Sequence, residues 1–496
     1  MSSLPVAVHT AGQVRALDRH AIDDLHIPSY TLMTRAGEAA LGVLRSCWPS
    51  AQHIAIVCGP GNNGGDGYVL ARLARARRLE VVAVGLHEPG QLQGDARRAH
   101  DDFVAAGGTV TAWRADCLRG ADVIVDAIFG VGLSRPVAGA AAEAIAAIND
   151  SERHVLALDI PSGLHADTGE VLGCAVRAAR TLAFIGLKLG FYLGDGPNCT
   201  GVVMFDPLEL PPEALTQVDA AATLIDEPSV AELLPPRRRT AHKGQQGSVL
   251  VIGGNIGMAG AARMAGEAAL RAGAGLVTVA TRSENVPAIV GARPELMCRG
   301  VASAEELTAL IGRADVIALG PGLGQDDWAK TMFDTALGTN QRTVIDADAL
   351  NLLAHSPRAN RHWILTPHPG EAGRLLGKTA GEIQRDRLGA ARAIALRYGC
   401  TVVLKGAGTL VVTDNACPAI CDRGNPGMAS AGMGDVLTGV IAGILAQSAD
   451  LAAAARVGVL VHALAGDMAA RRGERGLLAT DLLTYLPTCV NPSQRS

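Results

Sequence analysis

The chain has 496 residues, enough for about three domains or two large ones. It carries 44 Lys and Arg residues against 48 Asp and Glu, a formal net charge of −4, so no basic excess indicates a nucleic-acid or anionic-membrane partner. Hydrophobic residues make up 48% of the chain and charged residues 19%, which excludes a disordered protein and allows large apolar cores.

The cysteines and the apolar stretches indicate the compartment. The ten cysteines include no CxxC pair, so neither a zinc site nor a disulfide framework is predicted. The N-terminus lacks the basic-then-apolar pattern of a signal peptide, and the apolar stretch Leu451–Gly466 is interrupted by Arg456 and His462 and is short for a membrane span. We therefore expect a cytoplasmic protein with no membrane partner.

A proline-rich segment divides the chain. Six prolines fall within residues 207–236, and the basic run Arg237–Arg239 follows them. Such a composition between two glycine-rich halves is typical of a domain boundary. We predict two domains, residues 1–215 and 222–492.

The first half alternates short apolar strands with alanine-rich helices. The expected strands are His53–Cys58, Val81–Leu86, Ala121–Phe129, His154–Ile160 and Thr181–Leu187, and the expected helices are Tyr68–Arg78, Ala96–Ala106 and Ala140–Asn149. This alternation predicts an α/β fold with a parallel sheet that is covered on both faces. Ligands are then expected at the carboxyl ends of the strands.

A glycine-rich turn follows the first of these strands. Its sequence is GPGNNGGDG, residues 59–67, and a helix comes next. A turn of this kind offers free N–H groups and the positive end of a helix dipole to a phosphate. It matches neither the GxGxxG nor the P-loop pattern, and the alternative is an ordinary tight turn.

Acidic and hydroxyl side chains end two further strands of the first half. Asp126 opens the segment DAIFGVGLSRP, and Asp159 lies in LDIPSG, which also contains Ser162. Carboxylates at neighbouring strand ends can hold a cation or transfer protons, whereas a single Asp can also simply cap the next helix.

Together, the three motifs resemble the NAD(P)H-hydrate epimerase domain of the YjeF N-terminal type, over about residues 10–210. The resemblance implies a Rossmann-like three-layer α/β/α domain in which Asn63, Asp126 and Ser162 bind K⁺ and Asp159 and Asp126 are catalytic. It also implies two segments that contact the substrate: Asn62, Asn63, Gly64, Gly65 and Asp66, and Gly130, Val131, Gly132, Leu133, Ser134, Arg135 and Pro136, with Asp159. Some relatives are non-catalytic scaffold proteins, and that alternative stays open.

The second half repeats the alternation of strands and helices. The expected strands are Ser248–Ile252, Leu276–Ala280, Asp315–Leu319, Thr343–Asp346, Trp363–Thr366 and Thr401–Leu404. The segment GNPGMASAGMGD, residues 424–435, then opens a helix. Its backbone N–H groups could neutralise charge on a transferred phosphoryl group, and Asp435 could deprotonate the attacking hydroxyl; the alternative is a helix cap. Lys405, at a strand end, could pair with nucleotide phosphates or lie on the surface, and His368 could contact a ligand.

The motifs GPGLG, DADALNLL, TPHPGE, KGAGT and GNPGMASAGMGDVLTG resemble the ribokinase-like superfamily, and more closely its ADP/ATP-dependent NAD(P)H-hydrate dehydratase branch, over about residues 225–490. The resemblance implies that Ala261, Gly322, His368 and Asp435 contact the substrate. It also implies that Lys405, Gly406, Ala407, Gly408, Thr409 and Gly434 bind ADP, which enters with Mg²⁺.

The two resemblances imply one bifunctional repair enzyme. The first domain would interconvert the R and S hydrates of NADH and NADPH (NADHX and NADPHX), and the second would dehydrate the S form with ADP, giving AMP and phosphate. Family members often form larger assemblies, so a homo-oligomer is expected. The alternative is a vitamin kinase for a small alcohol, fused to a non-catalytic nucleotide-binding module.

Overall fold

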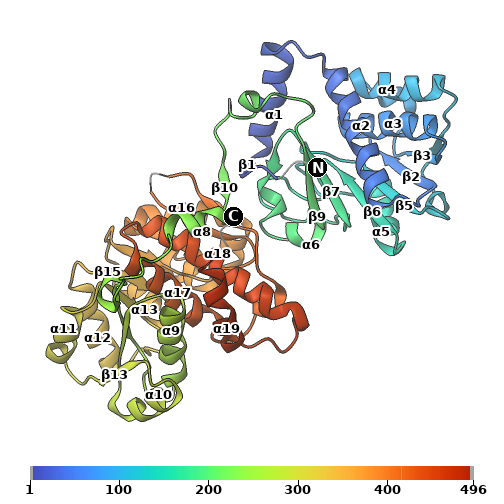
Figure 1. Cartoon of the computed structure of the whole chain (residues 1–496). Helices are drawn as coiled ribbons and strands as arrows, with labels where there is room; N and C mark the ends of the chain where they lie inside the picture. The colour runs from blue at the N-terminus through green and yellow to red at the C-terminus, as the bar shows by residue number, and fades with distance from the viewer. Residues whose placement is uncertain (1–3, 415, 492–496) are drawn as a thin grey trace. The chain divides into compact units, whose positions relative to one another are not determined.

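The computed structural model describes residues 4–414 and 416–491. The chain forms two compact units, Met1–Ala222 and Thr223–Ser496, each with its own sheet and core (Figure 1). The predicted α/β class with largely parallel sheets is confirmed in both units.

The sheet of the first unit has seven parallel strands in the order β4-β3-β2-β5-β6-β7-β9. The strands are β2 (His53–Cys58), β3 (Glu80–Gly85), β4 (Val110–Ala112), β5 (Val123–Ala127), β6 (His154–Leu158), β7 (Arg180–Phe184) and β9 (Val202–Asp206). A short parallel pair, β1 (Ala7–His9) and β8 (Leu187–Lys188), lies outside this sheet.

Helices cover both faces of this sheet, because its strands are apolar on both sides. One face packs against α2 (Ser29–Cys47), α3 (Asn62–Ala76) and α4 (Gly94–Ala105), which lie side by side in Figure 1. The other face packs against α5 (Gly139–Asp150). Ile54, Ile56 and Cys58 of β2 point to the first layer, whereas Ala55 and Val57 point to the second. The predicted three-layer arrangement results.

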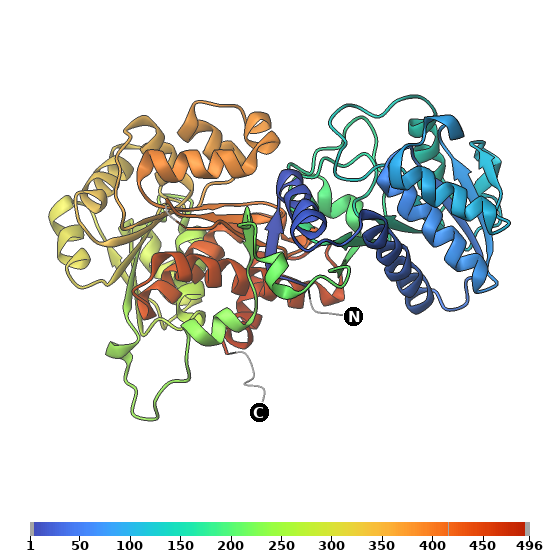
Figure 2. The same cartoon turned by 90° about the horizontal axis from the view of Figure 1, so that it is seen from above.

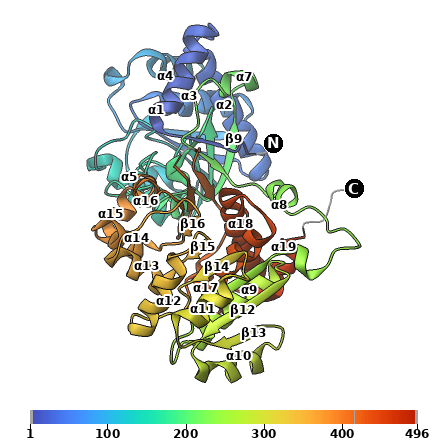
Figure 3. The ribbon, with the colours of Figure 1, turned by 90° about the vertical axis from the view of Figure 1, so that its left-hand side faces the viewer.

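The second unit has a mixed sheet in the order β13-β12-β11-β14-β15-β16-β17-β18-β19-β10. Strands β13, β12, β14, β15 and β16 of this sheet are labelled in Figure 3. Its strands are β10 (Ala222–Leu224), β11 (Ser248–Ile252), β12 (Leu276–Thr281), β13 (Met297–Gly300), β14 (Val316–Leu319), β15 (Arg342–Ile345), β16 (Trp363–Leu365), β17 (Thr401–Leu404), β18 (Thr409–Val412) and β19 (Ala419–Cys421). The pairs β17–β18 and β18–β19 are antiparallel, and the other pairs are parallel.

Two helical layers enclose this sheet as well (Figure 2). One contains α9 (Ala259–Arg271), α17 (Met433–Gln447), α18 (Leu451–Ala469) and α19 (Ala479–Cys489). The other contains α11 (Ala304–Ile311), α12 (Asp327–Leu337), α13 (Ala347–His355), α14 (Pro369–Leu376), α15 (Ala380–Arg385) and α16 (Arg387–Tyr398). Helices α17 and α9 pack backbone to backbone, because a Cβ on Gly439 would lie 2.1 Å from the Ala265 carbonyl oxygen. This contact requires glycine at position 439 and lets the two helices pack closely.

The structure corrects two expectations about element boundaries. The helix predicted from Tyr68 begins at Asn62, so the Asn-rich segment forms the first turn of α3 instead of a loop. The apolar stretch near residue 451 belongs to a helical run, Leu451–Arg472, which is long and apolar enough to cross a membrane by length and composition. That run is 61% buried within the protein and contributes to the core of the second unit.

Candidate active sites

A cavity of about 560 Å³ lies at the carboxyl ends of the strands in the first unit. The predicted residues among those that line it are Asn62, Asn63, Asp66, Gly130, Val131, Gly132, Leu133, Ser134, Arg135 and Asp159. Arg15, Asp18, Ser29 and Asp95 line it too, although no motif pointed to them. The ends of β2, β5 and β6 therefore meet at one site, as the parallel topology requires.

Three of the predicted contact residues, Gly64, Gly65 and Pro136, are not among the lining residues. A Cβ on Gly64 would lie 2.0 Å from the Gly59 carbonyl oxygen, and one on Gly65 would lie 2.6 Å from the Met33 methyl group. These two glycines are required by the packing of α3 against its surroundings.

Helix α3 presents its N-terminus to the cavity. Its N-cap residue is Gly61, which has no side chain to bond the first N–H groups, and Asn62 and Asn63 form the first turn. Unsatisfied N–H groups and the helix dipole favour an anion at this end.

A buried polar network lies beside the cavity, at the proposed K⁺ site. The Asp126 carboxylate accepts hydrogen bonds from the Ser162 backbone N–H (2.8 Å) and hydroxyl (2.6 Å). Phe129 N–H donates to Ser162 Oγ (2.8 Å), and Asn63 Nδ2 donates to the Phe129 carbonyl oxygen (2.9 Å). Asn63 Oδ1 is buried without a hydrogen-bond partner. This orphaned acceptor, together with hydroxyl, carbonyl and carboxylate oxygens, fits a cation that prefers oxygen ligands.

Asp126 itself is fully buried and does not line the cavity. Burial raises its pKa to about 6, although the hydrogen bonds from Ser162 and Ile128 act in the opposite direction. Because these neighbours already use its oxygens, its position supports a structural or ion-binding role and not the predicted proton transfer at the substrate.

Asp159 forms an ion pair with Lys188 at the base of the cavity. Lys188 Nζ binds Asp159 Oδ1 and also donates to the Phe184 carbonyl oxygen (3.2 Å). Asp159 has φ +65°, and Ile185, which also lines the cavity, has φ +62°. Left-handed backbone is costly for a β-branched residue and concentrates at functional sites.

Two further carboxyl groups face the same space. Burial raises the pKa of Asp66 well above its usual range, and the charges of Asp159 and Asp18 raise it further. Burial and the charge of Asp159 raise the pKa of Asp18 to about 6, against the opposing effect of Lys188 and Arg15. The cavity thus combines an ion-paired carboxylate with two carboxyl groups whose pKa values are raised, most strongly that of Asp66.

In the second unit, Lys405 lies in a buried charge cluster. Its Nζ lies 2.6 Å from Asp346 Oδ1 and 3.7 Å from Glu371 Oε2, and Thr438 Oγ1 donates to Asp346 Oδ2 (2.8 Å). Burial lowers the pKa of Lys405, but Asp346 and Glu371 outweigh burial and raise it. Lys405, with 19% of its side chain exposed, is therefore a largely buried cation held by two carboxylates and not a surface lysine.

Gly434 and Asp435 lie next to this cluster, in the first turn of α17. A Cβ on Gly434 would lie 3.3 Å from Lys405 Nζ, so the glycine allows close approach of the backbone. The N-cap residue, Gly432, has φ +87°. As a glycine it has no side chain that could bond the first N–H groups of the helix. Burial and the neighbouring charge of Asp346 raise the pKa of Asp435 to about 7. A carboxyl group with this pKa can act as a general base near neutral pH.

The KGAGT segment forms the turn of the β17–β18 hairpin. The buried guanidinium of Arg387 donates to the carbonyl oxygens of Leu404, Lys405 and Gly408. Burial lowers the pKa of Arg387 to about 10. The hydrogen bonds from Arg387 thus fix the backbone of residues 405–409, the segment predicted to bind ADP, which lies beside Gly434.

His368 is the N-cap residue of α14. Its Nδ1 accepts a hydrogen bond from Gly370 N–H (3.0 Å), and Glu371 Oε2 accepts one from the His368 N–H (2.7 Å). Burial and Lys405 lower its pKa. Nδ1 therefore caps the N-terminus of α14. The imidazole ring is half-exposed, so its other edge can make the predicted substrate contact.

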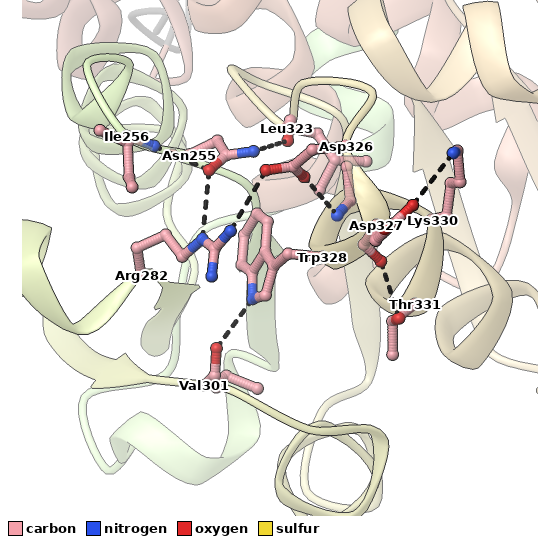
Figure 4. A network of polar contacts seen from close by, with 12 residues as sticks. Asn255, Ile256, Arg282, Val301, Leu323, Asp326, Asp327, Trp328, Lys330 and Thr331 are labelled. Atoms are coloured by element: carbon pink, nitrogen blue, oxygen red, sulfur yellow. Dashed lines mark hydrogen bonds and ion pairs between the residues drawn. The ribbon is translucent and has the colours of Figure 1, made fainter.

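The loops after β11, β12 and β14 are tied together by Arg282 (Figure 4). Its guanidinium donates to Asn255 Oδ1 (3.2 Å) and Asp326 Oδ2 (3.2 Å) and lies 4.9 Å from the Trp328 ring centroid. Asn255 Nδ2 donates to the Leu323 carbonyl oxygen (3.1 Å).

This arrangement brings together Gly322 and Ala261, two of the predicted substrate contacts. A Cβ on Gly322 would lie 3.1 Å from Ala261 Cβ and 2.8 Å from Met258, at φ +59°.

Lys188, Asp18 and Asp346 are among the polar residues that sequence reasoning did not select. Asp346 and Asp348 end a predicted strand in DADALNLL, so a signal was present for Asp346. Both Lys188 and Asp18 lie outside the glycine-rich motifs. The packing of α1 (Ala11–Arg19) brings Asp18 to the cavity, and that of β8 brings Lys188 behind Asp159. Within the described ranges, no group of three or more His, Cys, Asp and Glu side chains could hold a metal ion.

Comparisons with known proteins agree for both units. Residues 29–190 match the family model described as "YjeF-related protein N-terminus", and residues 249–488 match the model described as "NAD(P)H-hydrate dehydratase". The chain is 49% identical over 481 residues to the bifunctional NAD(P)H-hydrate repair enzyme of Coxiella burnetii. The matched region covers 97% of this chain and 98% of that protein. The chain is 44% identical over 491 residues to the enzyme of that name from Escherichia coli, covering 99% and 95%.

Solved structures resemble the second unit. A hypothetical protein from Streptococcus mutans has a TM-score of 0.51 at 33% identity and covers 54% of this chain and 98% of its own. A ribokinase-like superfamily protein from Enterococcus faecalis has a TM-score of 0.50 at 32% identity and covers 54% and 95%. The predicted ribokinase-like fold of the second unit is confirmed.

Proposed function

The chain belongs to the bifunctional NAD(P)H-hydrate repair enzymes, and from this membership we propose that its two sites act in sequence on one damaged nucleotide. The first unit epimerises the R and S forms of NADHX and NADPHX, and the second unit dehydrates the S form with ADP. The observation that carries this assignment is the pair of separate acidic sites, one at Asp159 and one at Asp435.

Epimerisation requires C6 of the hydrated ring to lose its hydroxyl group and regain it on the other face. A protonated hydroxyl leaves as water, the ring nitrogen lone pair forms a C=N bond, and a new water molecule adds to C6. The cavity offers two carboxyl groups with raised pKa values, Asp66 and Asp18, beside the carboxylate of Asp159. Such a separation of proton affinities supports acid and base roles. It also argues against the alternative of a non-catalytic module.

K⁺ is proposed to bind next to this cavity through Asn63, Ser162 and Asp126, with the orphaned Asn63 Oδ1 as the principal argument. When bound, the cation would neutralise the buried charge of Asp126 and hold the loops after β2, β5 and β6 in place. Asn63 and the residues of the 130–135 segment would then be oriented towards the substrate.

Dehydration begins with proton removal from the C6 hydroxyl, a role that we assign to Asp435. The oxygen attacks the terminal phosphorus of ADP, and AMP leaves. Free N–H groups at the α17 N-terminus would stabilise charge on the phosphoryl group, with the positive charge of Lys405 close by. The ring nitrogen lone pair then expels phosphate from C6, and loss of the C5 proton restores the C5=C6 bond.

The hairpin turn of residues 405–409 and Gly434 is proposed to bind ADP, and Ala261, Gly322 and His368 to contact the hydrate. Mg²⁺ is proposed to arrive with the nucleotide phosphates, and no described residue is assigned to it. Cytoplasmic location and homo-oligomeric assembly stay predictions. The match of residues 249–488 to the dehydratase model supports dehydration over the vitamin-kinase alternative.

Separate assays with single isomers test the proposal. Purified R-NADHX without nucleotide should give S-NADHX, and purified S-NADHX with ADP and Mg²⁺ should give NADH, AMP and phosphate. Asp159→Asn should abolish only the first conversion and Asp435→Asn only the second. Phosphorylation of hydroxymethylpyrimidine or thiazole alcohols without NADH formation from S-NADHX would contradict the assignment of the second unit.

A further inference from the structure

Lys188 is a fully buried cation behind the cavity of the first unit. Its side chain has 0% exposure, and its Nζ contacts Asp159 Oδ1 and the Phe184 carbonyl oxygen. The Phe191 ring centroid lies 5.8 Å away. Removing a lysine from water costs several kcal/mol unless a counter-charge compensates, and Asp159 supplies it.

The bond from Lys188 occupies only one oxygen of Asp159. Phe184 N–H also donates to Oδ1 (3.4 Å). Oδ2 is turned to the cavity side, where a Cβ on Gly130 would lie 3.5 Å from it. The carboxylate is thus fixed through one oxygen and presents the other at the site.

The charges around this pair are mostly negative. Asp66 on α3 and Asp18 on α1 face Asp159, and Arg15 on α1 also lies at the cavity. On the far side, His9 of β1 pairs in register with Lys188, and burial together with Lys188 lowers the pKa of His9. His9 is therefore neutral at pH 7, which leaves Lys188 as the buried positive charge that compensates the acidic groups.

We propose that Lys188 is a positioning residue for epimerisation: it holds Asp159 through Oδ1, so that Oδ2 is presented at the cavity to accept a proton. This inference rests on the proposed epimerase function. None of the motifs that carry the family resemblance contains Lys188, and it does not line the cavity, so its effect must pass through Asp159.

The step balances without an oxidant or a further reactant. Asp66, with Asp18 beside it, gives a proton to the C6 hydroxyl; the C6–O bond breaks, water leaves, and the ring nitrogen lone pair forms the C6=N bond. A second water molecule adds to the other face of C6 and gives its proton to Asp159. Exchange with solvent then returns the proton to Asp66, and in the opposite direction the roles reverse.

Four variants of the full chain test the inference: Lys188→Met, Lys188→Arg, Asp159→Asn and the double variant Asp159→Asn/Lys188→Met. The readouts are kcat, KM and the pH profile of R-to-S conversion of NADHX without nucleotide. Dehydration of purified S-NADHX by the second unit is the internal control for an intact chain. Lys330→Met is the matched surface control, because the exposed Lys330 ammonium group pairs with the exposed Asp327 carboxylate.

We expect Lys188→Met to lower kcat about 100-fold with little change in KM, since acid–base assistance is commonly worth that much. The pH profile of R-to-S conversion should also differ from that of the wild type, because the variant removes a fully buried positive charge from the site. Lys188→Arg should restore part of kcat. The kcat of the double variant should stay within about threefold of the kcat of Asp159→Asn, since a residue that acts through another gives non-additive effects.

Two results would overturn the inference. One is Lys188→Met activity and pH profile like those of Lys330→Met; the other is a double-variant loss equal to the product of the two single losses. If Lys188→Met fails to fold, the double variant, which removes both charges, and Lys188→Arg decide between the outcomes. Absence of epimerisation in the wild type would instead refute the proposed function itself.

Discussion

Lys405 Nζ lies 2.6 Å from Asp346 Oδ1, and this pair joins the ends of β17 and β15 beneath the first turn of α17. Thr438 of α17 completes the contact by donating to Asp346 Oδ2. Three segments far apart in the sequence therefore meet at one charge cluster. The cluster holds a positive charge next to Gly434, where the phosphates of ADP are proposed to bind.

Lys405→Met should destabilise the second unit as well as weaken ADP binding. The change leaves Asp346 and Glu371 buried without their cation, and breaking a buried pair on one side costs about 3 kcal/mol or more. Hydrogen exchange of the β15 and β17 amides measures this loss of stability at the site of the substitution. The double variant Asp346→Asn/Lys405→Met should recover part of it, whereas equal instability of both variants would contradict this account.

Dehydration should depend on pH through Asp435. Its pKa of about 7 means that the carboxylate needed as a base forms as pH rises through neutrality. The kcat/KM for S-NADHX should therefore fall as pH drops below about 7. Asp435→Asn should lower kcat/KM by about 100-fold or more at pH 8, and the gap to the wild type should narrow as pH falls. Asp327→Asn, which changes an exposed carboxylate on α12, is the matched control. A flat profile between pH 5 and 8 would exclude Asp435 as the base.

K⁺ should stabilise the first unit through Asn63. Replacing Na⁺ by K⁺ at constant ionic strength should raise the thermal midpoint of the first unit and the rate of epimerisation, because the cation would satisfy Asn63 Oδ1. Asn63→Leu should remove both responses. Asn198→Ala, an exposed amide on α6 (Gly196–Thr200), should retain them. Equal responses to Na⁺ and K⁺ in the wild type would refute the site.

Arg282→Met should raise the KM for S-NADHX and leave ADP affinity unchanged. The variant removes the hydrogen bonds to Asn255 and Asp326 that hold the loops around Gly322 in place. We expect the KM to rise about three- to tenfold, which corresponds to the loss of one or two side-chain hydrogen bonds. Arg282→Lys should restore less than full affinity because Lys lacks the planar fork. Arg299→Met on exposed β13 serves as the control, and a matching effect there would contradict the role of Arg282.

The parallel alternation of strands and helices, the approximate positions of the eleven expected strands and the glycine-rich segments were predictable from the sequence. The strands β1, β4, β8, β9, β10, β13, β18 and β19 were not predicted. The pattern works because strands buried on both faces are continuous apolar runs, as in His53–Cys58. The motif residues Asn63, Asp159 and Asp435 follow strands or open helices, and the topology then brings strand ends to one edge. Their roles in binding and catalysis stay predictions.

Tertiary packing decided what the sequence could not reveal. Lys188 reads as an ordinary lysine in a short apolar segment, and only its burial against Asp159 makes it part of the site. Asp18 lies on an amphipathic helix where an exposed carboxylate is the usual outcome. For Gly64 the motif suggested a ligand contact, but the contact with Gly59 explains the glycine by packing. Local patterns carry no information about such long-range neighbours.

The most direct measurement uses racemic NADHX, the purified full chain, ADP and Mg²⁺, followed by the absorbance of the reduced nicotinamide. If both sites work on one substrate, all of the hydrate should return to NADH, and Asp159→Asn should leave the R half unconverted. Recovery of only the S half by the wild-type protein would contradict the two-site account.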